Sequence, residues 1–358
     1  MGILRLLLAL SVLLAHLKYS YNSPFFNFTM VEVHVAVNAF FIVSGFYMAF
    51  ILNEKYIGKN KSYNLFITNR FMRIFPVYWV VLLLFVIYSS IRADIIFQTY
   101  IRNIPSFTSL YFLIKNIFLF SFISMPRSYI LDVPAWSLGV ELTFYLFAPL
   151  ITRLKFKKTL LLLLAYLFMD LFLSHTFLNH VINDIQSYFL QSQFTFFVLG
   201  ILSYWIYTKV KTLNIKKEIV TCTELIIIIY TLFYGFMPFL NNDILANIYY
   251  LLIACGIPFF FLNSRKNSVS NFLGELSYPI YISQWLVLYV LSDYIKIVPI
   301  NKNFIPMFEI IAVLLFSFLL YLVIMKPLDR IRDSRIKKKT IVSPKAIKEI
   351  PAYAIATD

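Results

Sequence analysis

Apolar stretches of membrane-spanning length recur along most of this chain, and short basic segments separate them. A helix needs about 20 predominantly apolar residues to cross the roughly 30 Å hydrocarbon core of a bilayer. With 60% hydrophobic residues and a mean hydropathy of +0.77, the chain has the composition of a polytopic membrane protein. The sequence therefore predicts an all-α membrane fold and excludes an ordinary soluble domain.

The basic segments predict the orientation of these helices. The formal charge of +15 lies mainly between the apolar stretches. Because cytoplasmic loops are enriched in Lys and Arg, this charge indicates topology and lipid contact, not a nucleic-acid partner. We predict about ten transmembrane helices with both termini in the cytoplasm. Their expected ranges are 2–21, 33–52, 75–91, 136–151, 159–174, 188–208, 218–238, 245–262, 270–292 and 305–325.

Two segments are predicted not to span the membrane. The 109–123 stretch is apolar but carries Lys115, and counting it as a span would put the next basic loop outside. We expect a re-entrant or interfacial helix there. Residues 1–330 should form one transmembrane domain, and residues 331–358 a basic cytoplasmic tail that is charged and disordered.

The first predicted helix carries two ionisable residues, Arg5 and His16, which are 11 positions apart. At 100° per residue they share a helix face within about 20°, with a rise of roughly 16 Å between them. Ionisable groups inside a membrane are costly and indicate function by default. We expect Arg5 at the inner mouth of a site and His16 deep within it. The alternative is a snorkelling arginine and a structural histidine.

Three further ionisable residues fit such a site. Arg70 and Arg73 are three residues apart and share a helix face at the same predicted mouth. Together with Arg5 they are suited to phosphate groups, because the guanidinium fork binds them bidentately, although topological charge is the alternative. Glu141 lies inside a predicted span near its outer end. Its carboxylate must therefore be neutral, paired or facing a wet cavity, where it could orient His16 or a substrate.

Four ordered motifs resemble those of the acyltransferase 3 family of bacterial membrane proteins, which transfer acyl groups, usually acetyl, to carbohydrates. Arg5 and His16 match the family's arginine–ten residues–histidine motif. The other three are HVAVNAFFIVSGF (34–46), NRFMRIFPVYW (69–79) and VPAWSLGVELTFYLFAPL (133–150), and LGELSYPIYIS (273–283) resembles a late serine–tyrosine helix. The chain departs from the family where Asn38 replaces an aspartate, Gln284 a histidine and Lys326 a glutamate.

The resemblance implies an O-acetyltransferase of the bacterial inner membrane, with acetyl-CoA as donor and no metal. It implies that the cofactor-binding residues are Arg5, Arg70 and Arg73 and the catalytic residues His16 and Glu141. His34, Asn38, Trp136 and Ser137 lie at the outer ends of predicted spans and are the candidates to bind the acceptor. We expect that acceptor to be a surface polysaccharide or lipid-linked glycan, with lipopolysaccharide O-antigen favoured.

Two other classes fit the same residues. In a transporter or flippase of a lipid-linked glycan, the arginines would bind a lipid pyrophosphate and His16 would relay protons. However, the paired halves and broken helices common in transporters are not evident in the sequence. A sensor gated by acyl-CoA would keep the donor site and lack an acceptor site. His175, His180 and Asp184 share one predicted outer loop, which we interpret as solvated and not as a metal site.

Overall fold

The structure is a computed structural model that describes residues 1–20, 30–55, 63–92, 107–119, 130–174, 190–213, 215–237, 242–264, 267–295 and 304–341. These ranges are helices joined by short connections, and they contain no strand. The α-helices are α1 (Gly2–Ser20), α2 (Val33–Phe50), α3 (Tyr63–Arg92), α5 (Phe107–Phe118), α6 (Ala135–Ile151), α7 (Phe156–Ser174), α9 (Leu190–Val210), α10 (Lys217–Phe233), α11 (Asn242–Ser264), α12 (Ser268–Tyr294), α13 (Ile305–Leu320) and α14 (Lys326–Ile341). Short π-helical or 3₁₀ turns are η2 (Ile51–Lys55), η5 (Tyr234–Phe236) and η7 (Tyr321–Met325).

Each predicted span coincides with one helix, which confirms the all-α membrane class. Two shorter helices, Gly2–Leu17 and Ala135–Ile151, are also apolar. Large apolar side chains are exposed along several helices, for example Leu83, Leu161 and Leu315, as expected where helices face lipid. Ten crossings and cytoplasmic termini remain predictions. By length and composition, the described helical segments that can cross a membrane are Val33–Glu54, Tyr63–Arg92, Lys217–Phe236, Asn242–Ser264 and Ile305–Arg332.

Two helix boundaries differ from the prediction. Helix α3 begins at Tyr63, so Pro76 lies inside the helix and not in its first turn. A proline within a helix removes one backbone hydrogen bond and its ring crowds the carbonyl four residues earlier, a cost that packing can offset, so it need not mark a boundary. The tail expected to be disordered from residue 331 is helical in α14 as far as Ile341, in continuity with α13 and η7. An ion pair three residues apart, Arg332 to Asp329 at 2.8 Å, supports that helix.

Helix α5 occupies most of the 109–123 stretch, whose last residues lie outside the described part of the chain. Lys115, which argued against a membrane span, is 5% exposed. Its Nζ lies over the ring of Tyr111, 5.4 Å from the centroid, a cation–π contact. The Tyr78 hydroxyl of α3 donates to the Asn116 carbonyl at 2.6 Å and holds the end of α5 against α3. Whether α5 is re-entrant stays a prediction.

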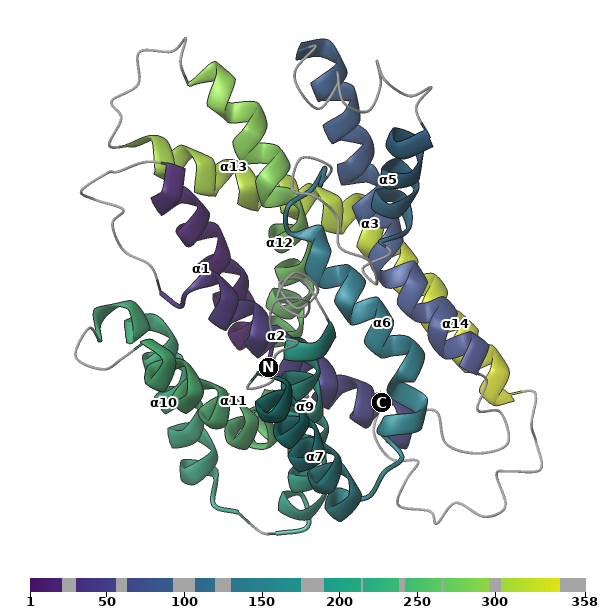
Figure 1. Cartoon of the computed structure of the whole chain (residues 1–358), viewed down its shortest axis with the longest axis vertical. Helices are drawn as coiled ribbons and strands as arrows, with labels where there is room; N and C mark the ends of the chain where they lie inside the picture. Colours follow the sequence, from purple (N-terminus) through teal and green to yellow (C-terminus); the bar gives the residue numbers. More distant parts are fainter. Residues whose placement is uncertain are drawn as a thin grey trace.

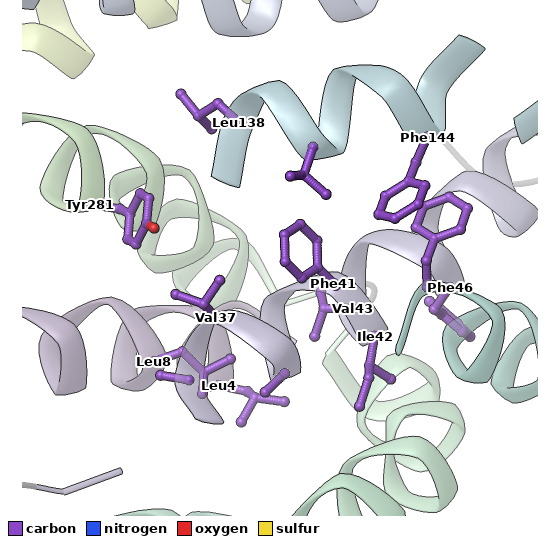
Figure 2. Close-up of a cluster of buried hydrophobic side chains, with 14 of the residues drawn as sticks. Leu4, Leu8, Val37, Phe41, Ile42, Val43, Phe46, Leu138, Phe144 and Tyr281 are labelled. Atoms are coloured by element: carbon purple, nitrogen blue, oxygen red, sulfur yellow. The ribbon is translucent and has the colours of Figure 1, made fainter. Parts of the chain in front are cut away.

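Helix α2 lies at the centre of the apolar core (Figure 2). Its Phe41 meets Phe144 of α6 edge to face, with ring centroids 6.0 Å apart. Leu4 and Leu8 of α1 are fully buried in the same cluster. An almost entirely apolar α2 follows from this position, because neighbouring helices cover it on most sides.

Two glycines allow α2 and α9 to pack with their backbones in close approach. A Cβ added at Gly45 would lie 2.1 Å from the Phe197 carbonyl oxygen, and one at Gly200 would lie 2.0 Å from the Ile42 carbonyl oxygen. No side-chain Cβ fits at such distances from a rigid backbone. Small residues of this kind are typical of helix pairs in membranes.

Gly200→Ala should therefore lower the stability of the protein, because the added methyl group forces α2 and α9 apart. We expect a cost of about 1–3 kcal/mol, as for other overpacked interiors. Gly256→Ala is the matched control, since its Cβ would meet side-chain atoms and no backbone, and its nearest contact is the flexible end of the Ile227 side chain. Thermal unfolding in detergent measures both variants. Equal midpoints for Gly200→Ala and wild type would contradict this account of the contact.

Candidate functional site

A cavity of about 480 Å³ opens between helices that are far apart in the sequence. Its walls come from α1, α2, α3, α6, α11, α12 and α14, which surround the centre of the bundle in Figure 1. Its four guanidinium groups outnumber its two carboxylates, so the cavity carries an excess of positive charge. We call it the arginine cavity; its charged lining residues are Arg5, Arg70, Arg73, Arg332, Glu141 and Glu275.

Close contact between α1 and α12 positions Arg5 in this cavity. A Cβ added at Gly274 would lie 2.9 Å from Gly2 Cα and 3.5 Å from Arg5 Nη1. The Gly2 amide also donates to Ser270 Oγ at 3.1 Å. Only glycines leave room for this approach, which sets the Arg5 guanidinium beside the turn of α12 that carries Glu275.

The two arginines of α3 enter the cavity from the same helix face, as their spacing predicts. Arg73 Nη2 lies 3.7 Å from Glu275 Oε1 of α12. Arg70 lies over the rings of Phe66 and Tyr145, with its Cζ 5.6 and 5.5 Å from the centroids. Ion pairing and cation–π contact thus hold both guanidinium groups in the wall of the cavity.

Glu141 belongs to the same cavity, although the sequence suggested a separate place near the outer surface. Its Oε1 accepts hydrogen bonds from Ser44 Oγ of α2 and from the Tyr145 hydroxyl one turn further along α6. Tyr145 also carries the Arg70 guanidinium on its ring. Glu141 is therefore part of the network that positions the arginines.

His16 lies outside the cavity wall, near its far end. That end is marked by Tyr281, whose hydroxyl is 2.9 Å from Ser137 Oγ and whose ring meets Phe40 at 5.8 Å. Trp285 follows Tyr281 by one helical turn on α12, and His16 packs edge-on against it with ring centroids 5.5 Å apart. The structure thus brings together Arg5, the α3 arginines, Ser137 and Glu141, and sets His16 one turn beyond them.

The other predicted acceptor-binding residues do not line the arginine cavity. His34 is on the surface, 67% exposed, 3.5 Å from the Glu32 carboxylate. Asn38 donates to the Tyr250 hydroxyl at 2.9 Å, and Trp136 packs against the main core. Their part in binding an acceptor stays a prediction.

The described residues contain no group of three or more His, Cys, Asp or Glu side chains that could hold a metal ion. The loop that carries His175, His180 and Asp184 lies outside these residues.

Sequence reasoning missed two charged residues of the cavity. Glu275 is a carboxylate in an apolar helix, which is the same signal that indicates Glu141. From the sequence it is named only within the motif LGELSYPIYIS (273–283). Arg332 lies among many charges in the predicted tail, so its sequence context gives no signal. Both residues can be assigned to the cavity only from the tertiary structure, in which α12 and α14 pack against α3.

Asp132, just before α6, is a third buried charge that the sequence did not single out. It is fully buried, and both carboxylate oxygens lack a hydrogen-bond partner within the described ranges. It lies near Tyr278 and Tyr281, with which it interacts electrostatically. Burial raises the pKa of the Asp132 carboxyl well above its usual range, because the charged form is poorly solvated there.

Asp132→Asn should therefore flatten the dependence of stability on pH. The unfolded carboxyl loses its proton near its ordinary pKa of about 3.9, whereas the folded one keeps it. The wild type then loses stability as the pH rises from about 4 towards the raised pKa of the folded state. We expect a smaller drop in thermal midpoint from pH 5 to pH 8 in the variant. Exposed Asp243→Asn is the control, and equal drops in all three proteins would contradict the prediction.

One comparison with known proteins agrees with the family that the motifs resemble. A family model described as an acyltransferase domain matches residues 1–326 of the chain. Searches of curated proteins and of solved structures gave no match. The matched range covers α1 to α13 and every charged residue of the arginine cavity except Arg332. With this match over nine-tenths of its length, the chain belongs to the acyltransferase 3 family and is a membrane acyltransferase.

Proposed function

We propose that this protein transfers an acetyl group from cytoplasmic acetyl-CoA to a hydroxyl group of a bacterial surface polysaccharide, with lipopolysaccharide O-antigen as the favoured acceptor. The observation that carries the proposal is the arginine cavity. It gathers guanidinium groups from separate helices beside only two carboxylates. Such a cluster suits a ligand with several phosphate groups, and acetyl-CoA has three.

In the proposed donor site, Arg5, Arg70 and Arg73 bind the phosphate groups. Glu275 and Glu141 keep the guanidinium groups oriented, through the ion pair to Arg73 and through the shared Tyr145. Acetyl-CoA supplies an acetyl group that is activated as a thioester. A donor extended from the arginines along the cavity would point its reactive end at Tyr281, and His16 lies beyond that end.

His16 acts as the general base in this proposal. It takes the proton of the acceptor hydroxyl as that oxygen bonds to the acetyl carbon and the carbon–sulfur bond breaks. The proton then passes to the departing thiolate, so that free coenzyme A and the acetyl ester are formed. The same imidazole could instead carry the acetyl group transiently, because both routes use one nucleophilic ring nitrogen. Partial burial of His16 in apolar surroundings helps to keep water from the thioester.

The test uses purified protein reconstituted in lipid vesicles with labelled acetyl-CoA and lipid-linked O-antigen. The proposal expects label in the glycan, with one coenzyme A released per acetyl group transferred. Movement of unlabelled glycan across the vesicle would support the transporter alternative. Binding of acetyl-CoA without any transfer would support the sensor and overturn the enzyme assignment.

A further inference from the structure

The C-terminal helix α14 adds a fourth arginine to the cavity. Arg332 is half-buried and lines the cavity from α14, of which only the first residue, Lys326, falls within the residues matched by the family model. Helix α14 packs against α3, which carries Arg70 and Arg73, and the two lie side by side in Figure 1. The family match thus covers the other three arginines of the cavity and ends before Arg332.

Arg332 is held in place by charged neighbours. Its Nη1 lies 2.8 Å from Asp329 Oδ1, one turn earlier on the same helix. It also interacts electrostatically with Glu275, the carboxylate paired with Arg73. A monodentate pair with Asp329 leaves other N–H donors of the guanidinium group available for a ligand.

The length of the cavity indicates which part of a ligand Arg332 would meet. The lining residues of α12 extend from Asn271 to Tyr281, which is a rise of about 15 Å along the helix. Glu275, with which Arg332 interacts electrostatically, is six residues before Tyr281 and is also paired with Arg73, so Arg332 belongs with the other arginines in the half of this stretch away from Tyr281. A donor whose thioester lies at the Tyr281 end therefore has its phosphate groups in the half of the cavity to which α14 contributes Arg332.

In a coenzyme A thioester, the acetyl group is at one end, the pyrophosphate is in the middle, and the 3′-phosphate is on the ribose at the other end. We propose that Arg332 binds the 3′-phosphate of the acyl-CoA donor, while the arginines of α1 and α3 bind the pyrophosphate. This inference rests on the proposed function, because it takes acyl-CoA as the ligand of the arginine cavity.

The experiment compares the binding of acetyl-CoA and of 3′-dephospho-acetyl-CoA by calorimetry on the purified full chain. In the wild type, removal of the 3′-phosphate should weaken binding about ten- to 100-fold, the loss expected for a charge-assisted hydrogen bond. Arg332→Ala should weaken acetyl-CoA binding by a similar factor and bind the two ligands equally. Non-additivity of this kind identifies groups in direct contact.

Arg330→Ala is the matched control, because Arg330 is exposed on the same helix and does not line the cavity. It should keep the wild-type preference for acetyl-CoA. Arg332→Lys retains a positive charge without the guanidinium fork and should keep part of the preference, which tests the contact even if the alanine variant folds poorly.

Two results would overturn the inference, and they are distinguishable. If Arg332→Ala keeps the full wild-type preference for the 3′-phosphorylated donor, Arg332 is not its ligand, and the proposed function is unaffected. If the wild type binds neither ligand, the proposed donor site fails as well.

Discussion

His16→Ala should abolish measurable acetyl transfer while leaving acetyl-CoA binding nearly unchanged. The reason is that His16 lies beyond the Tyr281 end of the arginine cavity and not among the residues that would hold the phosphate groups. General base catalysis contributes about 10²–10⁴-fold to a rate, so the loss should appear in kcat and not in donor affinity. Initial rates with labelled acetyl-CoA and calorimetric binding on the same preparation measure the two effects.

His16→Phe separates catalysis from packing. Phenylalanine retains an aromatic ring against Trp285 but has no nitrogen to take up a proton or an acetyl group. It should fold like the wild type and be as inactive as the alanine variant. A His16→Phe variant that transfers acetyl at the wild-type rate would make His16 a packing residue and would remove it from the mechanism.

Arg73→Ala should have the largest effect on donor binding. Arg73 forms an ion pair with Glu275, with Arg73 Nη2 3.7 Å from Glu275 Oε1. Its replacement by alanine removes a hydrogen-bond donor to the phosphate groups of the ligand. It also leaves the Glu275 carboxylate in the cavity without this partner. We expect acetyl-CoA affinity to fall by at least the roughly 1.5–3 kcal/mol of a charged hydrogen bond. Arg73→Lys should restore only part of it, because lysine lacks the bidentate fork.

Arg70→Ala should weaken binding in the same way, since Arg70 enters the cavity from the same face of α3. Arg153→Ala is the control for positive charge that serves topology alone, because Arg153 is exposed and does not line the cavity. Donor affinity measured by calorimetry should fall in the first variant and not in the second. If both α3 arginines can be replaced by alanine without loss of affinity, they serve orientation in the membrane and not ligand binding.

The positions of the helices are the part of the structure that local sequence indicates most directly. A helix in a bilayer satisfies its own backbone hydrogen bonds, so its position depends on a run of apolar residues and little else. Each predicted span therefore coincides with a helix, including the short apolar helix α6. The errors lie at boundaries, at the start of α3 and in the tail after residue 331, where a helix continues into less apolar sequence because neighbouring helices support it.

The candidate site could be predicted only in part. Spacing along one helix places Arg70 and Arg73 on one face, and the structure agrees. The same argument put His16 on the face of Arg5, but about 16 Å of rise separates two such residues, so sharing a face does not mean sharing a cavity. The structure accordingly has Arg5 in the wall and His16 beyond it.

The sequence by itself determined that this chain is a helical membrane protein with the ordered motifs of an acyltransferase, because hydropathy and motif spacing are local properties. Only the tertiary structure decided which charged groups face one another. Glu275 of α12 forms an ion pair with Arg73 of α3, and Arg332 of the C-terminal helix α14 lines the same cavity. Such contacts depend on close helix approaches, for example at Gly2 and Gly274, whose geometry is fixed by packing and not by the order of residues.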